Sequence, residues 1–148
     1  MITKRMLTAG AIAIASAALA AAQGTTSPPK TVNGLQVTVK SAERTERASL
    51  RDCPPSTNSV NAVQRPGDEI AVVTVNFKVM SDFKPVMMKR PTVTAADDKV
   101  YNTSVQFVDV GSVPEYACQF VYRVPTGTKL KTLQIEGASF DISALESK

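Results

Sequence analysis

The stretch that decides the fold class of this chain reads Ile70-Ala71-Val72-Val73-Thr74-Val75-Asn76-Phe77-Lys78-Val79-Met80. From Ala71 to Val79 every second residue is apolar, whereas the residues between them change from apolar to polar along the stretch. A period of two is that of a β-strand. Apolar residues on both faces at one end indicate a strand that is partly central in its sheet. We therefore predict a strand over residues 70–80.

The same alternation recurs on both sides of this strand. Residues 35–40 and 116–124 alternate between apolar and polar, and a hairpin is predicted where 92–95 and 100–102 flank the polar turn at 96–99. Weaker extended segments lie at Val86–Arg90, Val105–Phe107, Thr132–Glu136 and Phe140–Ile142. Repeated strands with turn signals between them, and no helical pattern after residue 22, predict an all-β fold. We expect an immunoglobulin-like antiparallel β-sandwich over residues 34–143.

The N-terminal segment has the three parts of a secretory signal. Residues 1–5 carry two positive charges, residues 6–22 form an uncharged apolar run, and small residues precede Gln23. A membrane-spanning helix needs about 20 strongly apolar residues, whereas this run is shorter and mostly alanine. We expect residues 1–22 to form a helical signal peptide that is cleaved before Gln23. The protein is then exported to the periplasm, the cell envelope or the extracellular medium, without a transmembrane anchor after cleavage.

Three other segments lack the alternation of a strand. Residues 23–33 are polar and rich in Pro, Ser and Thr, so we expect a flexible leader, and residues 144–148 read as a polar tail. Residues 43–68 begin with many charges and continue with many Pro, Ser, Thr and Asn residues. Long loops in compact domains are usually functional or loosely ordered. The segment 43–68 is therefore a candidate binding loop, and a face of the sandwich is the alternative binding surface.

The chain contains two cysteines, Cys53 in the irregular segment and Cys118 in the predicted strand 116–124. An even number of cysteines in an exported chain favours a disulfide, because export compartments are oxidising. Two free thiols are the alternative. A Cys53–Cys118 bond would pin the irregular segment to the body of the domain.

Four short strand patterns follow one another along the chain, at Gly34–Val39, Gly67–Phe77, Val93–Tyr101 and Phe120–Pro125. In their order they resemble the DUF4352 family of secreted, immunoglobulin-like bacterial domains, and the resemblance covers residues 34–142. It implies a sandwich fold and an exported or envelope-attached location. It implies no activity, because the function of that family is unsettled.

The chain also departs from related patterns. Met80-Ser81-Asp82-Phe83 stands where the family has an Asn-led polar turn. Tyr116-Ala117-Cys118 has the Tyr-x-Cys spacing of the tyrosine corner of immunoglobulin domains, but the chain has no tryptophan, so the Cys-Trp-Cys core of antibody domains is absent. Tyr116 is either a packing residue or a corner residue.

The composition excludes several classes of chemistry. The chain has no histidine, which rules out Ser-His-Asp and Cys-His mechanisms and removes the commonest zinc and Cu(II) ligand. The adjacent carboxylates Asp97 and Asp98 lie in a predicted turn, where we expect them to be solvated and not catalytic. The net charge is +4, and it falls by two to +2 when Lys4 and Arg5 leave with the signal. We expect no enzyme, no cofactor and no binding of nucleic acid.

Two clusters remain as candidate sites. Met80, Met87 and Met88 carry thioethers, which favour Cu(I), although methionine also commonly fills protein cores. Lys84, Lys89 and Arg90 form a candidate basic patch for an anionic partner, or a solvated edge.

Taken together, these features favour a non-enzymatic exported binding or structural module of the bacterial cell envelope, which contacts a protein or a surface polymer. The alternative is a periplasmic Cu(I)-handling protein that uses the methionine cluster.

Overall fold

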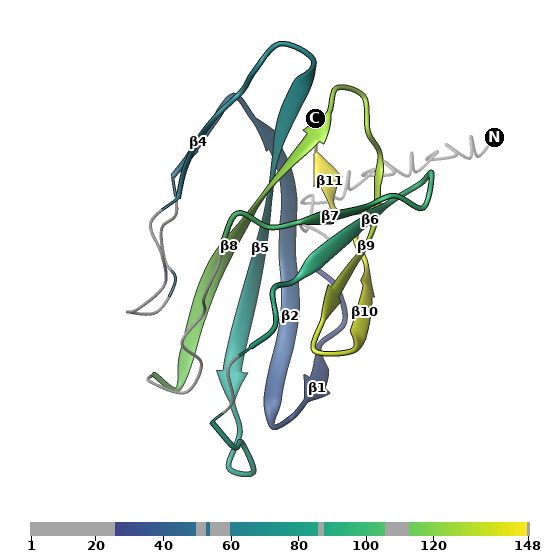
Figure 1. Ribbon diagram of the computed structural model, residues 1–148. Coiled ribbons are helices and arrows are strands. Elements are labelled where there is room, and N and C mark those ends of the chain that lie inside the picture. The colour runs from purple at the N-terminus through teal and green to yellow at the C-terminus, as the bar shows by residue number, and fades with distance from the viewer. Residues whose placement is uncertain (1–25, 50–52, 54–59, 86–87, 106–112, 148) are drawn as a thin grey trace, which may run out of the picture.

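The computed structural model describes residues 26–49, 53, 60–85, 88–105 and 113–147 (Figure 1). These residues form strands and no helix, so the predicted all-β sandwich is confirmed. The predicted signal peptide lies outside the described residues. Within them, no helix has the length and apolar character needed to cross a membrane.

The first sheet has five strands, with the order β1-β2-β5-β8 and with β11 pairing parallel to β2. Its strands are β1 (Lys30–Val32), β2 (Leu35–Thr45), β5 (Asp68–Val79), β8 (Glu115–Pro125) and β11 (Glu146–Ser147). The second sheet has the order β10-β9-β6-β7. Its strands are β6 (Thr92–Ala95), β7 (Val100–Asn102), β9 (Leu130–Ile135) and β10 (Ala138–Asp141). A separate pair is made by β3 (Arg47–Ser49) and β4 (Asn61–Val63).

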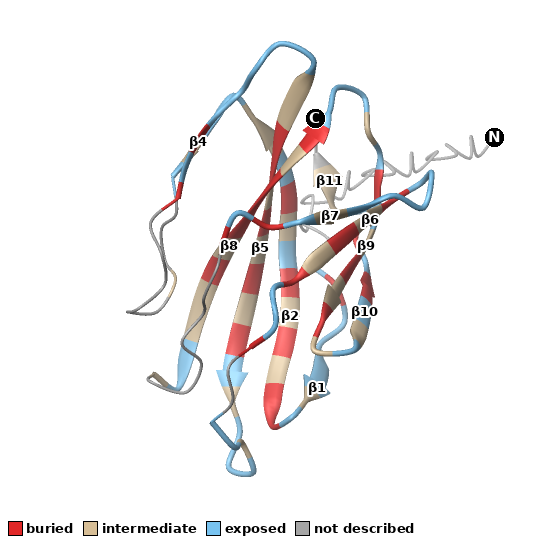
Figure 2. Cartoon of the chain, in the orientation of Figure 1, coloured by how far each residue is buried: buried red, intermediate tan, exposed pale blue. Residues whose placement is uncertain are grey.

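The chain changes sheet between β5 and β6, between β7 and β8, between β8 and β9, and between β10 and β11. This gives the central strand orders A-B-E and G-F-C of an immunoglobulin-like sandwich, with β2, β5 and β8 as A, B and E. Strand β5 lies between β2 and β8, as its apolar residues on both faces predict. Figure 2 shows buried and less buried residues alternating along β2, β5 and β8.

Strand β2 is longer than the alternation of residues 35–40 predicts, because a β-bulge interrupts it. The register of β2 against β5 shifts between Val39 and Ser41, and the strand then continues to Thr45. Before the bulge Val37 and Val39 are buried, and after it Ala42 is buried. One extra residue reverses the alternation. The second half of β2 therefore resembles an irregular segment in the sequence.

The sheet also includes parts of the predicted leader and tail, so those two predictions are wrong in part. Strand β1 pairs with β2 through the turn at Asn33 and Gly34, which both have positive φ, at 49° and 75°. Before it, buried Ser27 exchanges two 2.9 Å hydrogen bonds with the backbone of Val39. At the other end, β11 pairs with Ala42 and Glu43 of β2.

The remaining strand predictions have mixed outcomes. The hairpin of residues 92–102 is confirmed as β6 and β7, and β8, β9 and β10 lie close to the predicted segments. The edge-like strand at 86–90 is wrong for residues 88–90, which are not in a strand; residues 86 and 87 are not described. Val105 is buried, and the rest of the extended stretch around it lies outside the described residues.

Candidate functional site: a disulfide-bonded flap

The segment 43–68, which the sequence presents as irregular, contains an antiparallel strand pair. Strands β3 and β4 pair in the register Arg47 to Val63, Ala48 to Ala62 and Ser49 to Asn61. Among the described residues neither strand belongs to the two main sheets, and β4 stands apart from them in Figure 1. We call β3 and β4 the flap. The prediction of an irregular loop is therefore wrong for these two strands.

The flap lies against one end of the first sheet. Ile70 and Val121 alternate with the core-facing residues of β5 and β8, and they point to the opposite face of the sheet. Both are nevertheless buried. Strand β3 lies against β5, Ala62 is buried, and Ala48 packs against the same apolar cluster. The flap thus packs against the apolar cluster at this end of the sheet.

A covalent bond and a hydrogen bond hold the flap to strand β8. The predicted Cys53–Cys118 disulfide is present; it joins the connection between β3 and β4 to a fully buried position of β8. Arg123 of β8 donates a 3.0 Å hydrogen bond from Nη2 to the carbonyl of Val63, and its Nη1 lies 3.6 Å from a carboxylate oxygen of Asp68. The disulfide of antibody domains joins the two sheets, whereas this bond joins the flap to one sheet.

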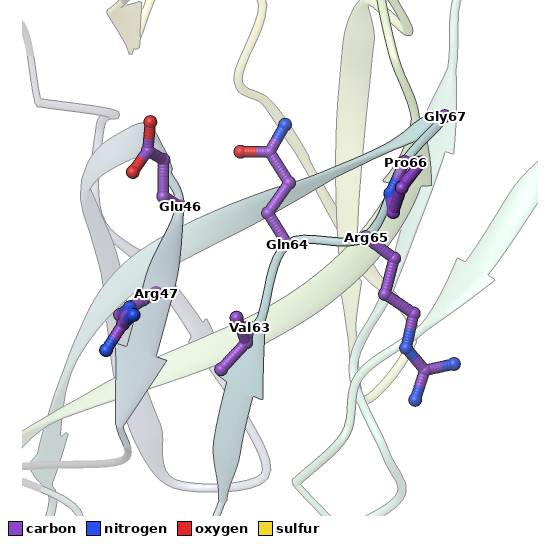
Figure 3. Close-up of a pocket in the computed structure, with 7 residues that line it drawn as sticks. All are labelled: Glu46, Arg47, Val63, Gln64, Arg65, Pro66 and Gly67. Carbon is purple, nitrogen blue, oxygen red and sulfur yellow. The ribbon is translucent and has the colours of Figure 1, made fainter.

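The outer face of the flap carries an exposed apolar side chain between two arginines. In Figure 3 the side chains of Arg47, Val63 and Arg65 point to one side, whereas Glu46 and Gln64 point to the other. The side chains are arranged in this way because Arg47 is the cross-strand partner of Val63, and Arg65 lies two residues beyond it. Val63 is 54% exposed. A shallow cavity of about 330 Å³ is lined by Glu46, Arg47, Val63, Gln64, Arg65, Pro66 and Gly67.

The two arginines have no acidic partner among the described residues. The ion pairs found there use Arg44, Lys99, Arg123 and Lys131 as their cations. Because Arg47 and Arg65 are both exposed and lie in no such pair, their guanidinium groups are open to an external anion. Neither arginine was singled out from the sequence. Their signal in the sequence is their position on either side of the cysteine-bearing connection.

A larger cavity, of about 730 Å³, lies where β2, β5 and the turn from β8 to β9 meet the C-terminal segment. Its central group is Arg44, which donates to Glu146 and to the carbonyl of Thr128 and lies 3.5 Å from Glu69. Glu146 also accepts a 3.2 Å hydrogen bond from the backbone of Leu130. These charges are therefore already paired within the chain, where they fasten the C-terminal strand to the sandwich.

The basic patch predicted from the sequence is exposed but is not purely basic. Lys84, Lys89 and Arg90 are all exposed, and none of them is in a strand. The backbone of Lys89 donates a 2.6 Å hydrogen bond to the carboxylate of Glu136, which brings a negative charge beside the patch. A partner for this patch stays a prediction.

The predicted methionine cluster is divided by burial. Met80 follows β5 and is 37% exposed, whereas Met88 is 4% exposed and belongs to the hydrophobic core; Met87 lies outside the described residues. The described residues also contain no group of three or more His, Cys, Asp and Glu side chains placed to hold a metal ion. Cu(I) binding stays a prediction, and a Cu(I) titration tests it: affinity no tighter than micromolar would contradict it.

The acidic turn is exposed to solvent, as expected, and the ring of Tyr116 is packed against another aromatic ring. Asp97 and Asp98 are exposed and lie 3.3 and 3.5 Å from Lys99 and Lys131. A hydrogen bond from the Lys99 backbone is the main cause that lowers the pKa of Asp97, whereas a catalytic acid needs a raised pKa. Tyr116 stacks on Phe77 with ring centroids 5.2 Å apart, so it is a packing residue.

The fold and this site define an immunoglobulin-like β-sandwich with a disulfide-bonded flap. Comparisons with protein-family models, with curated proteins and with solved structures found no match to the chain.

Proposed function

We propose that this chain is an exported, non-enzymatic binding module of the bacterial cell envelope, and that the outer face of the flap contacts its partner, a protein or a surface polymer. The observation that carries this proposal is the exposed Val63 between Arg47 and Arg65, two cations without a described acidic partner. Protein interfaces combine an apolar centre with polar surroundings, and arginine is over-represented among their strongest contacts.

The attachment of the flap supports this role. A surface that is already held in its binding conformation loses less conformational entropy when a partner arrives. The disulfide and the Arg123–Val63 hydrogen bond restrain the flap before any partner is bound. The flap thus combines two arginines that can pair with an external anion with a backbone that is already restrained.

Export is part of the proposal and rests on two features. Residues 1–22 have the composition of a secretory signal, and disulfides persist mainly in oxidising compartments outside the cytoplasm. The resemblance to DUF4352 domains agrees with both. Cell fractionation with intact-mass analysis tests the proposal: we expect a chain that begins at Gln23 and lacks two protons relative to its reduced form. A full-length chain in the cytoplasm would contradict it.

Site-specific crosslinking in intact cells tests the binding surface. A photo-crosslinking amino acid replaces Val63 in one variant and Val100 in the other, because both valines are exposed strand residues, at 54% and 59%. We expect a defined product from position 63, reduced when Arg47→Gln and Arg65→Gln are added, and none from position 100. Equal products at both positions would exclude the flap as the specific docking surface.

A further inference from the structure

We propose that the outer face of the flap binds an extended acidic polypeptide segment, in which two carboxylates flank an apolar side chain. The carboxylates pair with Arg47 and Arg65, and the apolar side chain covers Val63. This inference rests on the proposed function, because it names the class of partner that the same surface takes.

The positions of the three side chains support a partner in which an apolar side chain lies between two carboxylates. Arg47 and Val63 are direct cross-strand partners, whose Cβ atoms lie about 5 Å apart in such pairs. Val63 and Arg65 are two residues apart, which is about 7 Å in extended chain. Val63 is thus the corner of a bent arrangement, with one arginine across the strand pair and the other along the chain. Alternate side chains of an extended peptide lie about 7 Å apart. A segment with acidic, apolar and acidic residues at alternate positions presents the complementary groups in this order, and the long glutamate and arginine side chains span the bend.

The positive charges of Arg47 and Arg65 support an acidic partner. Glu46 points to the other side of the flap in Figure 3, and Asp68 is paired with Arg123. No described carboxylate forms an ion pair with Arg47 or Arg65, so both guanidinium groups keep a positive charge that no described residue pairs. A guanidinium group forms paired, charge-assisted hydrogen bonds with a planar carboxylate. The complementary charge on a partner is thus negative.

The exposed side chain of Val63 distinguishes a polypeptide partner from a purely anionic polymer. A polyphosphate chain would satisfy the two arginines but would leave Val63 in contact with water. An acidic polypeptide satisfies all three side chains, because it removes apolar surface of Val63 from water while its carboxylates meet the guanidinium groups. The apolar centre of the site therefore favours the polypeptide.

The test uses the oxidised exported chain and labelled peptides, with binding followed by fluorescence anisotropy. The main probe has the sequence Gly-Ser-Glu-Ser-Leu-Ser-Glu-Ser-Gly, and two matched probes replace both Glu by Gln or Leu by Ser. Inorganic polyphosphate competes as the anion without an apolar group. The variants are Arg47→Gln with Arg65→Gln, and the control Lys40→Gln with Lys78→Gln, which removes the same charge from exposed residues elsewhere.

We expect the main probe to bind and the arginine double variant to weaken its affinity about tenfold. The lysine control is expected to change the affinity less than about twofold, and both matched probes to bind more weakly than the main probe. Each double variant is first checked for an unchanged thermal unfolding transition, because all four residues are exposed.

Three outcomes would overturn the inference. They are no binding of the main probe at millimolar concentration, equal losses in the two double variants, and a polyphosphate affinity that equals that of the main probe and depends on Arg47 and Arg65. The proposed function has a separate readout, the crosslink at position 63. If that crosslink persists while the peptide fails, the flap is still the docking surface and only the class of partner is wrong.

Discussion

The flap and the β6–β7 hairpin are both pairs of short antiparallel strands, and they are held to the molecule in different ways. The hairpin continues into a sheet, because β6 also pairs with β9. The flap makes no ladder with either main sheet in the described part of the chain. Each pair exposes one valine, Val63 in the flap and Val100 in the hairpin.

Strand β8 anchors both pairs, through different residues. For the hairpin, the Tyr122 hydroxyl donates to the carbonyl of Pro91 just before β6, and Thr103 just after β7 donates to the carbonyl of Val121. For the flap, Cys118 supplies the disulfide and Arg123 supplies a side-chain hydrogen bond. An isolated two-stranded pair is marginally stable in water. The comparison therefore indicates that the flap depends on its few attachments, whereas the hairpin depends on the sheet.

Removing the disulfide should have the largest effect, and the flap should show it most. Replacing Cys53→Ser and Cys118→Ala removes a covalent link between residues 65 apart, for which the chain-entropy model gives about 4 kcal/mol. Chemical denaturation measures the loss of unfolding free energy. Native-state hydrogen exchange locates it: amides of Asn61–Val63 should lose protection before those of Thr92–Ala95. Equal loss of protection in both pairs would show that the flap is not an independent unit.

The anchor of the hairpin should have the second-largest effect. Tyr122→Phe keeps the buried ring but removes the hydrogen bond to Pro91, with an expected loss of about 1–1.5 kcal/mol of unfolding free energy. Hydrogen exchange should increase in β6 and β7 and stay unchanged in the flap. An increase in hydrogen exchange confined to the flap would show that Tyr122 stabilises the flap and not the hairpin.

The same tyrosine predicts a dependence on alkaline pH. Burial raises the pKa of Tyr122 well above its ordinary value, because the apolar core disfavours the phenolate. A raised folded-state pKa gives stability that is fully present below the unfolded value of about 10 and is lost as the pH rises further. We expect Tyr122 to ionise only on unfolding, as measured at 295 nm, and Tyr122→Phe to abolish that late step.

A smaller effect is expected from the polar attachment of the flap. Arg123→Gln removes the hydrogen bond to Val63 and the ion pair with Asp68, in side chains that are about one-third exposed. After allowance for solvent screening we expect a loss of about 0.5–1 kcal/mol. Lys131→Gln is the matched control, because its ion pair with Asp98 near the hairpin is mostly exposed. If the control costs as much as Arg123→Gln, the flap attachment has no special role.

The smallest effect is expected at the turn of the hairpin. Asp97 is exposed, and its pKa is lowered chiefly by the hydrogen bond from the Lys99 backbone. A lowered carboxyl pKa gives stability that is present above the unfolded value of about 3.9 and is lost as the pH falls through the folded value. Asp97→Asn should remove this acid dependence in the hairpin amides without changing the flap. Acid dependence that survives the substitution would assign it to another group.

The two pairs also differ in how far the sequence predicts them. The hairpin is predicted because apolar alternation on both sides of the turn at residues 96–99 is a local pattern. The flap is not predicted, because its two strands have three residues each and show no measurable period. They also lie on opposite sides of Cys53 in the sequence. The bulge in β2 conceals the preceding strand by reversing its alternation. The turn at Asn33 and Gly34 is a strong hairpin signal that the polar composition around it obscured.

By itself the sequence determined the all-β class, the long strands and the cysteine pair, because alternation along a strand and the number of cysteines are local properties. The tertiary structure alone decided where Arg47, Val63 and Arg65 lie, because cross-strand pairing brings them to one face from separate segments. It also decided that Ile70 and Val121 are buried on the second face of the sheet. Contacts between segments far apart in the chain leave no periodic trace in the sequence, and the candidate site is made of such contacts.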